Sequence, residues 1–190
     1  TKRALQIAGR GEEVSHVAQL FYPSMQVADV FQLDVDICQL GLDQRKANML
    51  AREIAEKLKW KKPVALHHRM LLGLDGMSSA SVSDEASIDA EIGAKMSKSK
   101  PNTCIFVHDS LEQIKQKINA AYCPAKIAAG NPVLEYSREI VFRAFGEMEI
   151  ERPTKFGGTL SFANYAELEA QFIAGKLHPM DLKNSVAVNL

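Results

Sequence analysis

Apolar residues recur with two different periods in the first third of the chain. Residues 12–33 follow a helical pattern, with Pro23 at a point where a first helical turn would restart. The alternation in residues 35–40 predicts a half-buried strand, and residues 63–67 predict a second one. Between the strands, Asp43 is placed to cap an amphipathic helix. Strand, helix and strand in this order predict a βαβ unit with two parallel strands.

The pattern changes twice after the second strand. Residues 77–94 are rich in Ser, Ala, Asp and Glu and carry few large apolar side chains, which predicts a long loop. Beyond it the pattern becomes helical, with helix starts at Ser110, Asn131, Asn164 and His178. The predicted fold class is therefore α/β, with a half-domain of parallel sheet in residues 1–105 and a helical domain in residues 106–190.

Composition and charge narrow the functional classes. Lys plus Arg and Asp plus Glu number 23 each, so the formal net charge is zero and nucleic-acid binding would need local basic patches. No apolar run approaches the roughly 20 residues that span a bilayer, so we expect no membrane partner. Three widely spaced cysteines indicate reduced thiols of a cytoplasmic protein rather than disulfides or a zinc site. The chain starts without Met and ends within a helical pattern, so we expect a piece of a longer protein.

The segment from Lys95 to Ser99 carries two ammonium groups and two hydroxyl groups at the end of the predicted loop. Such groups suit phosphate chemistry, because Lys side chains neutralise the charge that develops on transferring and leaving phosphates. The other interpretation is a solvated basic loop without a chemical role.

Two sets of polar residues in the first third are candidates for ligand binding. Tyr22, Gln26 and Asp29 share a helix face, where a phenol, an amide and a carboxylate could bind a small polar ligand. The same spacing fits an ordinary amphipathic helix whose polar face meets water. Gln44–Lys46 follows a strand and begins a helix, which is where open α/β sheets bind ligands. A charged turn at the surface is the alternative.

The second half of the chain offers fewer candidates. Phe156 lies in a connector with two glycines, where its ring could stack on an unpaired base or fill a gap between helices. His178 and Asp181 begin the last helix, and Asp181 could simply complement the helix dipole. His67 and His68 point to opposite sides of a strand, with no Cys or acidic ligand at zinc spacing, so we expect no metal site.

Taken together, these strings resemble one family, the tyrosyl-tRNA synthetases of archaea and eukaryotes, which are class I aminoacyl-tRNA synthetases. Lys95–Ser99 matches the second signature of that class at every position. The resemblance runs in order over nearly the whole chain, and its other strings are Tyr22–Asp29, Asp43–Lys46, Gly73–Gly76, Ala121–Pro124, Lys155–Gly158 and His178–Asn184. It implies the second half of a Rossmann-type catalytic domain in residues 1–105. It also implies an α-helical anticodon-binding domain, truncated at its end, in residues 106–190.

The resemblance further implies a tyrosine site and an ATP site. Asp29 would accept a hydrogen bond from the substrate phenol, and the groups around the substrate's amino end would be Tyr22, Gln26 and Gln44. The signature loop would stabilise pyrophosphate while the adenylate forms. Its catalytic residues would be Lys95, Lys98 and Ser99, and its ATP contacts would be Lys95, Met96, Ser97, Lys98 and Ser99.

Two groups of tRNA contacts are implied in the same way. Arg45 and Lys46 would contact the first base pair of the acceptor stem. Phe156, His178 and Asp181 would read the anticodon, with Phe156 stacking on a base.

The implied activity is that of a tyrosine–tRNA ligase. Tyrosine attacks the α-phosphate of ATP, which enters with Mg²⁺, to give tyrosyl-adenylate, and tRNA(Tyr) then accepts the tyrosyl group. Positioning and charge stabilisation suffice for both steps. We therefore expect tyrosine, ATP and tRNA(Tyr) as partners of a cytoplasmic enzyme that is a homodimer at full length and holds no structural metal.

The sequence departs from the family in two places. The first signature, of the His-x-Gly-His type, is missing from this chain, so we expect the chain alone not to activate tyrosine. The stretch 77–94 is long for the family. Two alternatives remain, a non-catalytic tRNA-binding fragment and the tryptophan-specific sister enzyme. Asp29 and His178–Asp181 argue against the tryptophan enzyme.

Overall fold

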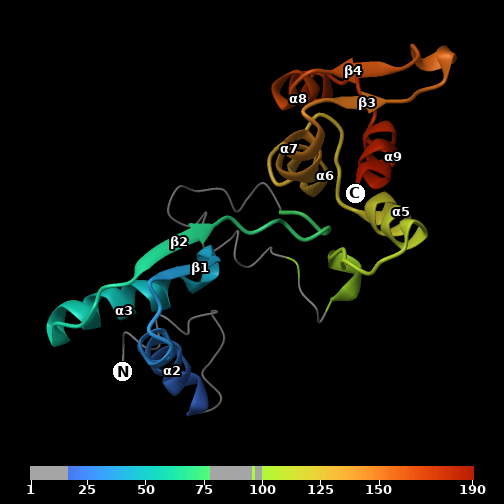
Figure 1. Cartoon of the computed structure of the whole chain (residues 1–190). Coiled ribbons are helices and arrows are strands. Elements are labelled where there is room, and N and C mark those ends of the chain that lie inside the picture. Colours follow the sequence, from blue (N-terminus) through green and yellow to red (C-terminus); the bar gives the residue numbers. More distant parts are fainter. Residues whose placement is uncertain (1–16, 78–95, 97–99) are drawn as a thin grey trace. The chain divides into compact units, whose positions relative to one another are not determined.

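The computed structural model describes residues 17–77, 96 and 100–190, which fall into two compact units (Figure 1). Unit 1 ends at Met70 and unit 2 begins at Leu71. Nearly all of the predicted loop at 77–94 lies outside the described residues, as do Lys95 and residues 97–99. The domain boundary predicted near residue 105 stays a prediction.

Unit 1 is a βαβ unit preceded by a helix. Its two strands pair in parallel, with Ile37 opposite Val64 and Gly41 opposite His68. A helix joins them, which confirms the predicted order of elements. In chain order the elements are α2 (Ala18–Gln32), β1 (Ile37–Gly41), the 3-10 turn η1 (Leu42–Gln44), α3 (Arg45–Leu58) and β2 (Val64–His68).

Two local details of unit 1 differ from the sequence prediction. Pro23 is the sixth residue of α2 and lies inside it, rather than at a restarted first turn. Proline lacks an N–H donor and its ring crowds the carbonyl one turn earlier, so one helical hydrogen bond near the start of α2 is lost while the later turns keep theirs. Asp43 lies in η1, and Gln44 takes the N-cap position of α3 without a side-chain hydrogen bond to the helix.

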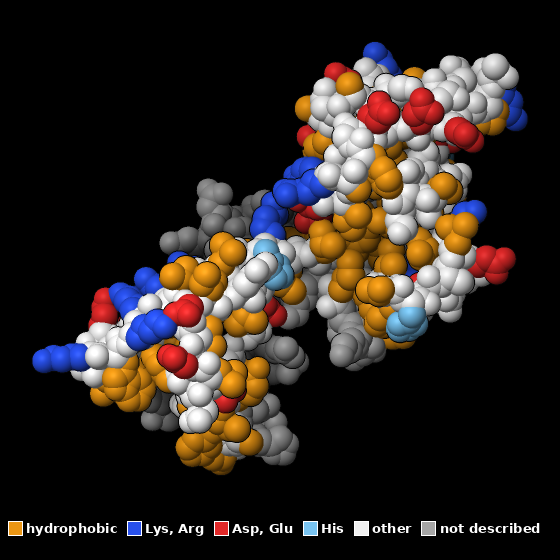
Figure 2. All heavy atoms as spheres, viewed as in Figure 1, with side chains coloured by type: hydrophobic (Ala, Val, Ile, Leu, Met, Phe, Trp, Pro, Cys, Tyr) orange, Lys and Arg blue, Asp and Glu red, His pale blue; other side chains and the backbone are white. Residues whose placement is uncertain are grey.

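The core of unit 1 is small, and part of its apolar surface is open. The buried core residues are Val27, Val30, Cys38 and Ala51. In contrast, Ile37 on β1 and both Val64 and Leu66 on β2 are more than half exposed. Figure 2 shows hydrophobic side chains at the surface of this unit. Parallel strands usually have both faces covered, so β1 and β2 are atypical in their exposure.

Unit 2 is mainly helical and also contains a small antiparallel sheet. Met148 pairs with Phe162, and Ile150 pairs with Leu160. The sequence pattern predicts the helices here but not this hairpin. In chain order the elements are η3 (Pro101–Thr103), α5 (Leu111–Ala120), α6 (Pro132–Tyr136), the π-helical turn η4 (Ser137–Val141), α7 (Phe142–Phe145), β3 (Met148–Ile150), η5 (Thr154–Phe156), β4 (Leu160–Phe162), α8 (Tyr165–Ile173) and α9 (Pro179–Asn189).

Side chains cap the helices of unit 2 where the sequence predicts them. Gln113 N donates to Ser110 Oγ at 3.3 Å, and Ser110 N donates to Gln113 Oε1 at 2.8 Å, which completes a capping box at the start of α5. Asn131 and Asn164 likewise accept backbone N–H groups at the starts of α6 and α8. These caps fix where three helices begin.

One continuous core holds unit 2 together. It joins α5, α6, β3, α8 and α9 through fully buried side chains, among them Ile118, Leu134, Tyr136, Ile150, Phe172 and Leu182. The segment after Leu71 is tied to this core, because Leu72 N donates to Glu135 Oε2 at 2.9 Å and Tyr136 Oη donates to Leu72 O at 2.7 Å. Among the helices of the described ranges, none has the length and apolar character needed to cross a membrane.

Candidate functional site

The predicted tyrosine-binding residues of α2 share one accessible face. The continuous helix keeps Tyr22, Gln26 and Asp29 at the spacing that the sequence indicates. Tyr22 is 61% exposed, Asp29 is also exposed, and Gln26 is half-buried. Pro23 and Val27, on the neighbouring side of the helix, are buried. The phenol, amide and carboxylate are therefore accessible, and the described part of unit 1 does not enclose them.

The second predicted set lies at the carboxyl end of β1. Gln44 is half-buried at the N-cap of α3, and Arg45 and Lys46 are exposed in the first turn of that helix. Because β1 and β2 are parallel, both strands end at this edge of the sheet. The first N–H groups of α3 add a positive field to the two cationic side chains. The arrangement suits an anionic group such as a phosphate.

A buried amide close to this edge was missed by the sequence analysis. Asn48 lies one turn beyond Gln44 on α3 and is 2% exposed. Neither Nδ2 nor Oδ1 of Asn48 has a hydrogen-bond partner within the described part of the chain. Buried polar groups nearly always have partners, so Asn48 is a candidate for bonding to atoms that the described residues do not supply. The available signal was one amide among the alanines of the buried face, Ala47, Ala51 and Ala55.

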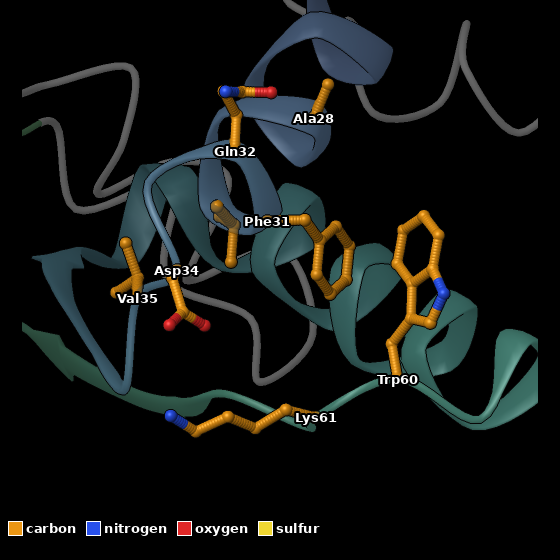
Figure 3. Close-up of a pocket in the computed structure, with 8 residues that line it drawn as sticks. Ala28, Phe31, Gln32, Asp34, Val35, Trp60 and Lys61 are labelled. Atoms are coloured by element: carbon orange, nitrogen blue, oxygen red, sulfur yellow. The ribbon is translucent and has the colours of Figure 1, made fainter.

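An open hollow of about 570 Å³ lies between α2 and the segment before β2 (Figure 3). The rings of Phe31 and Trp60 meet edge to face in it, with centroids 4.9 Å apart. The ammonium group of Lys61, which also lines the hollow, pairs with Asp36. None of the site residues predicted from the sequence lines this hollow.

Met96 is the described residue of the Lys95–Ser99 segment. Its side chain is half-buried and packs against the core of unit 2. Lys95, Ser97, Lys98 and Ser99 lie outside the described residues, so their predicted roles stay predictions.

Unit 2 brings together three strings that are far apart in the sequence. Leu74 N donates to Thr103 O at 2.9 Å, and Thr103 lies just after the signature segment in the sequence. Tyr122 N donates to Leu74 O at 2.7 Å. Gly76 has φ +70°, and a Cβ there would lie 2.4 Å from the Tyr122 ring, so this contact requires glycine. Backbone hydrogen bonds therefore join the Gly73–Gly76 string to two later segments of the chain, at Thr103 and at Tyr122.

Phe156 ends the 3-10 turn η5 in the connector between β3 and β4. Phe156 is 60% exposed, and Lys155 Nζ lies 4.9 Å from the centroid of its ring. Gly157 and Gly158 follow with φ of +99° and +72°, which turns the chain back toward β4. The exposure contradicts the interpretation of Phe156 as a plug between helices, and its stacking on a base stays a prediction.

His178 and Asp181 lie together at the start of α9. His178 is the N-cap, and its Nδ1 accepts a hydrogen bond from Met180 N at 3.2 Å. Asp181 N donates to His178 O at 3.1 Å, and the Asp181 carboxylate lies in the first turn, where the helix dipole favours it. One imidazole edge and one carboxylate are therefore presented at the same helix terminus.

Lys183, one turn further along α9, has a structural role. It is 8% exposed, and its Nζ donates to Asn119 O at 2.9 Å, near the end of α5. A cation at the C-terminus of a helix is favourable, so Lys183 ties α9 to α5. The sequence alone did not separate this lysine from the residues available to a ligand.

The described ranges hold no group of three or more His, Cys, Asp or Glu side chains that could bind a metal ion. His67 Nδ1 lies 3.2 Å from Gly41 O, which gives that ring a structural contact in the sheet. The thiols of Cys38, Cys104 and Cys123 form no disulfide with one another. Burial raises the pKa of Cys123, so this thiol stays protonated and unreactive near neutral pH.

A family model described as tRNA synthetases class I (W and Y) matches residues 2–190. The chain belongs to this family. As a class I synthetase chain it has a mixed α/β fold, which confirms the fold class at that level. The resemblance to tyrosyl-tRNA synthetases drawn from the sequence is confirmed by the individual relatives.

This class I synthetase chain is 49% identical over 192 residues to the tyrosine–tRNA ligase of Aeropyrum pernix and 48% identical over 194 residues to that of Saccharolobus solfataricus. The matches cover 100% of this chain and 53% and 52% of those proteins. Among solved structures, tyrosyl-tRNA synthetase complexed with L-tyrosine from Pyrococcus horikoshii has a TM-score of 0.86 at 42% identity, covering 98% of this chain and 54% of that one. The chain thus spans about half the length of the curated relatives it matches.

Proposed function

We propose that this chain is part of a cytoplasmic tyrosine–tRNA ligase of the archaeal and eukaryotic type. The observation that carries the proposal is the 49% identity to a tyrosine–tRNA ligase over the whole chain. The same relatives favour tyrosine over the tryptophan-specific alternative. The activity belongs to the whole protein, because the relatives that carry this name are about twice as long as this chain.

The exposed strands support a larger parallel sheet in the whole protein. β1 and β2 pair in parallel but expose Ile37, Val64 and Leu66. A two-stranded sheet is marginal by itself, and parallel sheets are normally covered on both faces. We infer that residues 1–105, which include unit 1, are the second half of a Rossmann-type catalytic domain, and that residues 106–190, within unit 2, are the anticodon-binding domain.

In the proposed tyrosine site, Asp29 accepts a hydrogen bond from the substrate phenol. Tyr22, Gln26 and Gln44 surround its amino end. The exposure of the α2 face supports this assignment, because a substrate and a second wall of the site can both reach it. Phenylalanine would leave the enclosed Asp29 carboxylate without a donor, which penalises the wrong amino acid.

In the proposed first step, the carboxylate of tyrosine attacks the α-phosphate of ATP and pyrophosphate leaves. Lys95, Lys98 and Ser99 stabilise the charge on the leaving phosphates, and Met96 and Ser97 complete the loop. Mg²⁺ enters bound to the ATP phosphates.

In the proposed second step, the terminal hydroxyl of tRNA(Tyr) takes the tyrosyl group. Arg45 and Lys46 are exposed at the start of α3, where the first base pair of the acceptor stem would bind. Phe156, His178 and Asp181 would hold the anticodon. We expect the full-length enzyme to act as a homodimer.

ATP–pyrophosphate exchange on the full-length protein tests this proposal, with tyrosine and tryptophan offered separately. We expect exchange with tyrosine alone, and a loss of at least about tenfold in kcat/KM in Asp29→Asn, because an amide replaces the carboxylate acceptor of the phenol. Exchange with tryptophan and none with tyrosine would end the assignment. Binding of tRNA(Tyr) without any exchange would instead support a non-catalytic tRNA-binding protein.

A further inference from the structure

One side chain closes the base of the loop that carries Phe156. Arg152 Nε donates to Gly158 O at 3.0 Å, across the mouth of the loop. Inside the loop, Phe156 N and Gly158 N both point to Pro153 O, at 2.9 and 3.4 Å. The guanidinium lies against the turn, since a Cβ on Gly157 would be 3.2 Å from Arg152 Nη2. The backbone of this loop is therefore held at both ends.

The same guanidinium reaches the turn that leads into α9. Arg152 Nη1 donates to Lys176 O at 3.2 Å, two residues before His178. Backbone hydrogen bonds to the last turn of α8 fix Gly175 and Lys176 in that turn. Arg152 thus joins the two segments that carry Phe156 and His178, which β4 and α8 separate in the sequence.

We propose that Arg152 is a positioning residue for RNA recognition, because it fixes the Phe156 loop relative to the start of α9. The inference rests on the proposed function, since it concerns the anticodon site. Because Phe156 is 60% exposed, it gains little restraint from packing. Holding its loop in advance lowers the entropy lost when a base stacks on the ring.

The geometry separates this role from a direct contact with phosphate. Two donors of Arg152, Nε and Nη1, are directed to backbone carbonyl groups, and the side chain is half-buried. The neighbouring Lys155 and Lys176 are exposed and better placed to meet a polyanion. The planar guanidinium fork of an arginine can donate to two carbonyl groups at once in a fixed geometry, which the single ammonium of a lysine does not reproduce.

The test is an anisotropy titration of the anticodon stem-loop RNA of tRNA(Tyr) with the full-length protein that contains this chain. We expect Arg152→Met to weaken binding about tenfold, a loss comparable to that of one stacked base. Arg152→Lys should weaken it similarly, because one ammonium does not bridge Gly158 O and Lys176 O. The matched control is Arg143→Met, which removes an exposed arginine of α7 paired with Glu139 at 2.8 Å and should leave binding unchanged.

Two further measurements distinguish positioning from a phosphate contact. The slope of log affinity against log salt should match wild type in Arg152→Met, whereas loss of a phosphate contact lowers it by about 1. In a Phe156→Ala background, Arg152→Met should weaken binding by less than about twofold, because its effect acts through that ring. Thermal unfolding checks that each variant is folded. If Arg152→Met does not fold, the result with Arg152→Lys decides the test.

Three results would overturn the inference. The first is RNA binding at the wild-type affinity in both Arg152 variants. The second is a reduced salt slope in Arg152→Met while Arg152→Lys binds the RNA as wild type does, and the third is that Arg152→Met weakens binding as much in the Phe156→Ala background as it does alone. Failure of the proposed function gives a different result, because Phe156→Ala alone would then bind the RNA as wild type does.

Discussion

Tyr136→Phe tests how the segment that follows Leu71 is held on unit 2. The Tyr136 ring is fully buried, and its hydroxyl donates to Leu72 O at 2.7 Å. Burial, followed by the charge of Glu135, raises the pKa of Tyr136, so the hydroxyl remains a donor at any pH at which the protein is handled. The substitution keeps the ring and removes only this hydrogen bond.

The expected loss in the free energy of unfolding follows from these contacts. Removing the donor leaves Leu72 O buried without that hydrogen bond, which costs about 1–3 kcal/mol. Since the ring stays in place, a cavity adds little. We therefore expect a loss of about 2 kcal/mol, which corresponds to a fall in Tm of about 4–8 °C for a chain of this size.

Urea unfolding followed by far-UV circular dichroism, with hydrogen exchange at the Leu72 amide, measures this loss. Trp60 fluorescence would report on unit 1 instead. The matched control is Tyr165→Phe, whose half-buried hydroxyl donates to Glu169 Oε1 at 2.8 Å and should contribute less than about 1 kcal/mol. Stability of Tyr136→Phe within about 0.3 kcal/mol of wild type would refute the reasoning, since a buried carbonyl should not lose its donor so cheaply.

Two predictions concern the start of α5. The hydrogen bond from Lys117, at 2.5 Å, and then that from Phe106 N lower the pKa of Asp109. Its folded pKa thus lies below the unfolded value of about 3.9, so the stabilisation is complete above that pH and is lost as the pH falls further. Asp109→Asn should lose this stabilisation at neutral pH, and its stability should fall less steeply as the pH is lowered. Ellipticity measured against pH will show both effects. An unchanged acid profile would contradict this. Ser110→Ala should cost about 1 kcal/mol in urea unfolding, because Gln113 N loses its cap, and a loss below about 0.3 kcal/mol would contradict it.

Local sequence signals were sufficient where the physical cause is itself local. Ser110 and Gln113 are three residues apart, so the capping box depends on nothing distant, and it was predicted correctly. The βαβ order was predictable because the period of the apolar residues changes twice between 35 and 67. Asp43 was assigned wrongly as a cap, since the 3-10 turn before α3 shifts the N-cap by one residue.

The hairpin of unit 2 left too little pattern to detect. Its strands, Met148–Ile150 and Leu160–Phe162, have three residues each, shorter than a run in which alternation can be recognised. The π-helical turn at Ser137–Val141 was also missed, because it interrupts an otherwise continuous helical stretch from Pro132 to Phe145. Both features depend on packing against the core rather than on local propensity.

Contacts between distant residues were beyond the sequence analysis for another reason. Nothing in the composition near Leu72 indicates that Glu135 and Tyr136 bind its backbone. Similarly, Arg152 and Lys176 are joined only because β3, β4 and α8 fold back on each other. A resemblance to a family can point to Phe156 and His178, but the side chain that links their loops is found only in the structure.

The string His178–Asn184 shows how burial separates two kinds of residue within one motif. Leu182 is in the core and Lys183 bonds to α5, so both would be kept for folding alone. His178 is exposed at the N-cap and Asp181 is half-buried in the first turn, which leaves them accessible at the helix terminus. Since a ligand can use only accessible atoms, burial removes Leu182 and Lys183 from the candidates in this motif. His178 and Asp181 are among the accessible residues that remain, and their assignment to the anticodon stays a prediction.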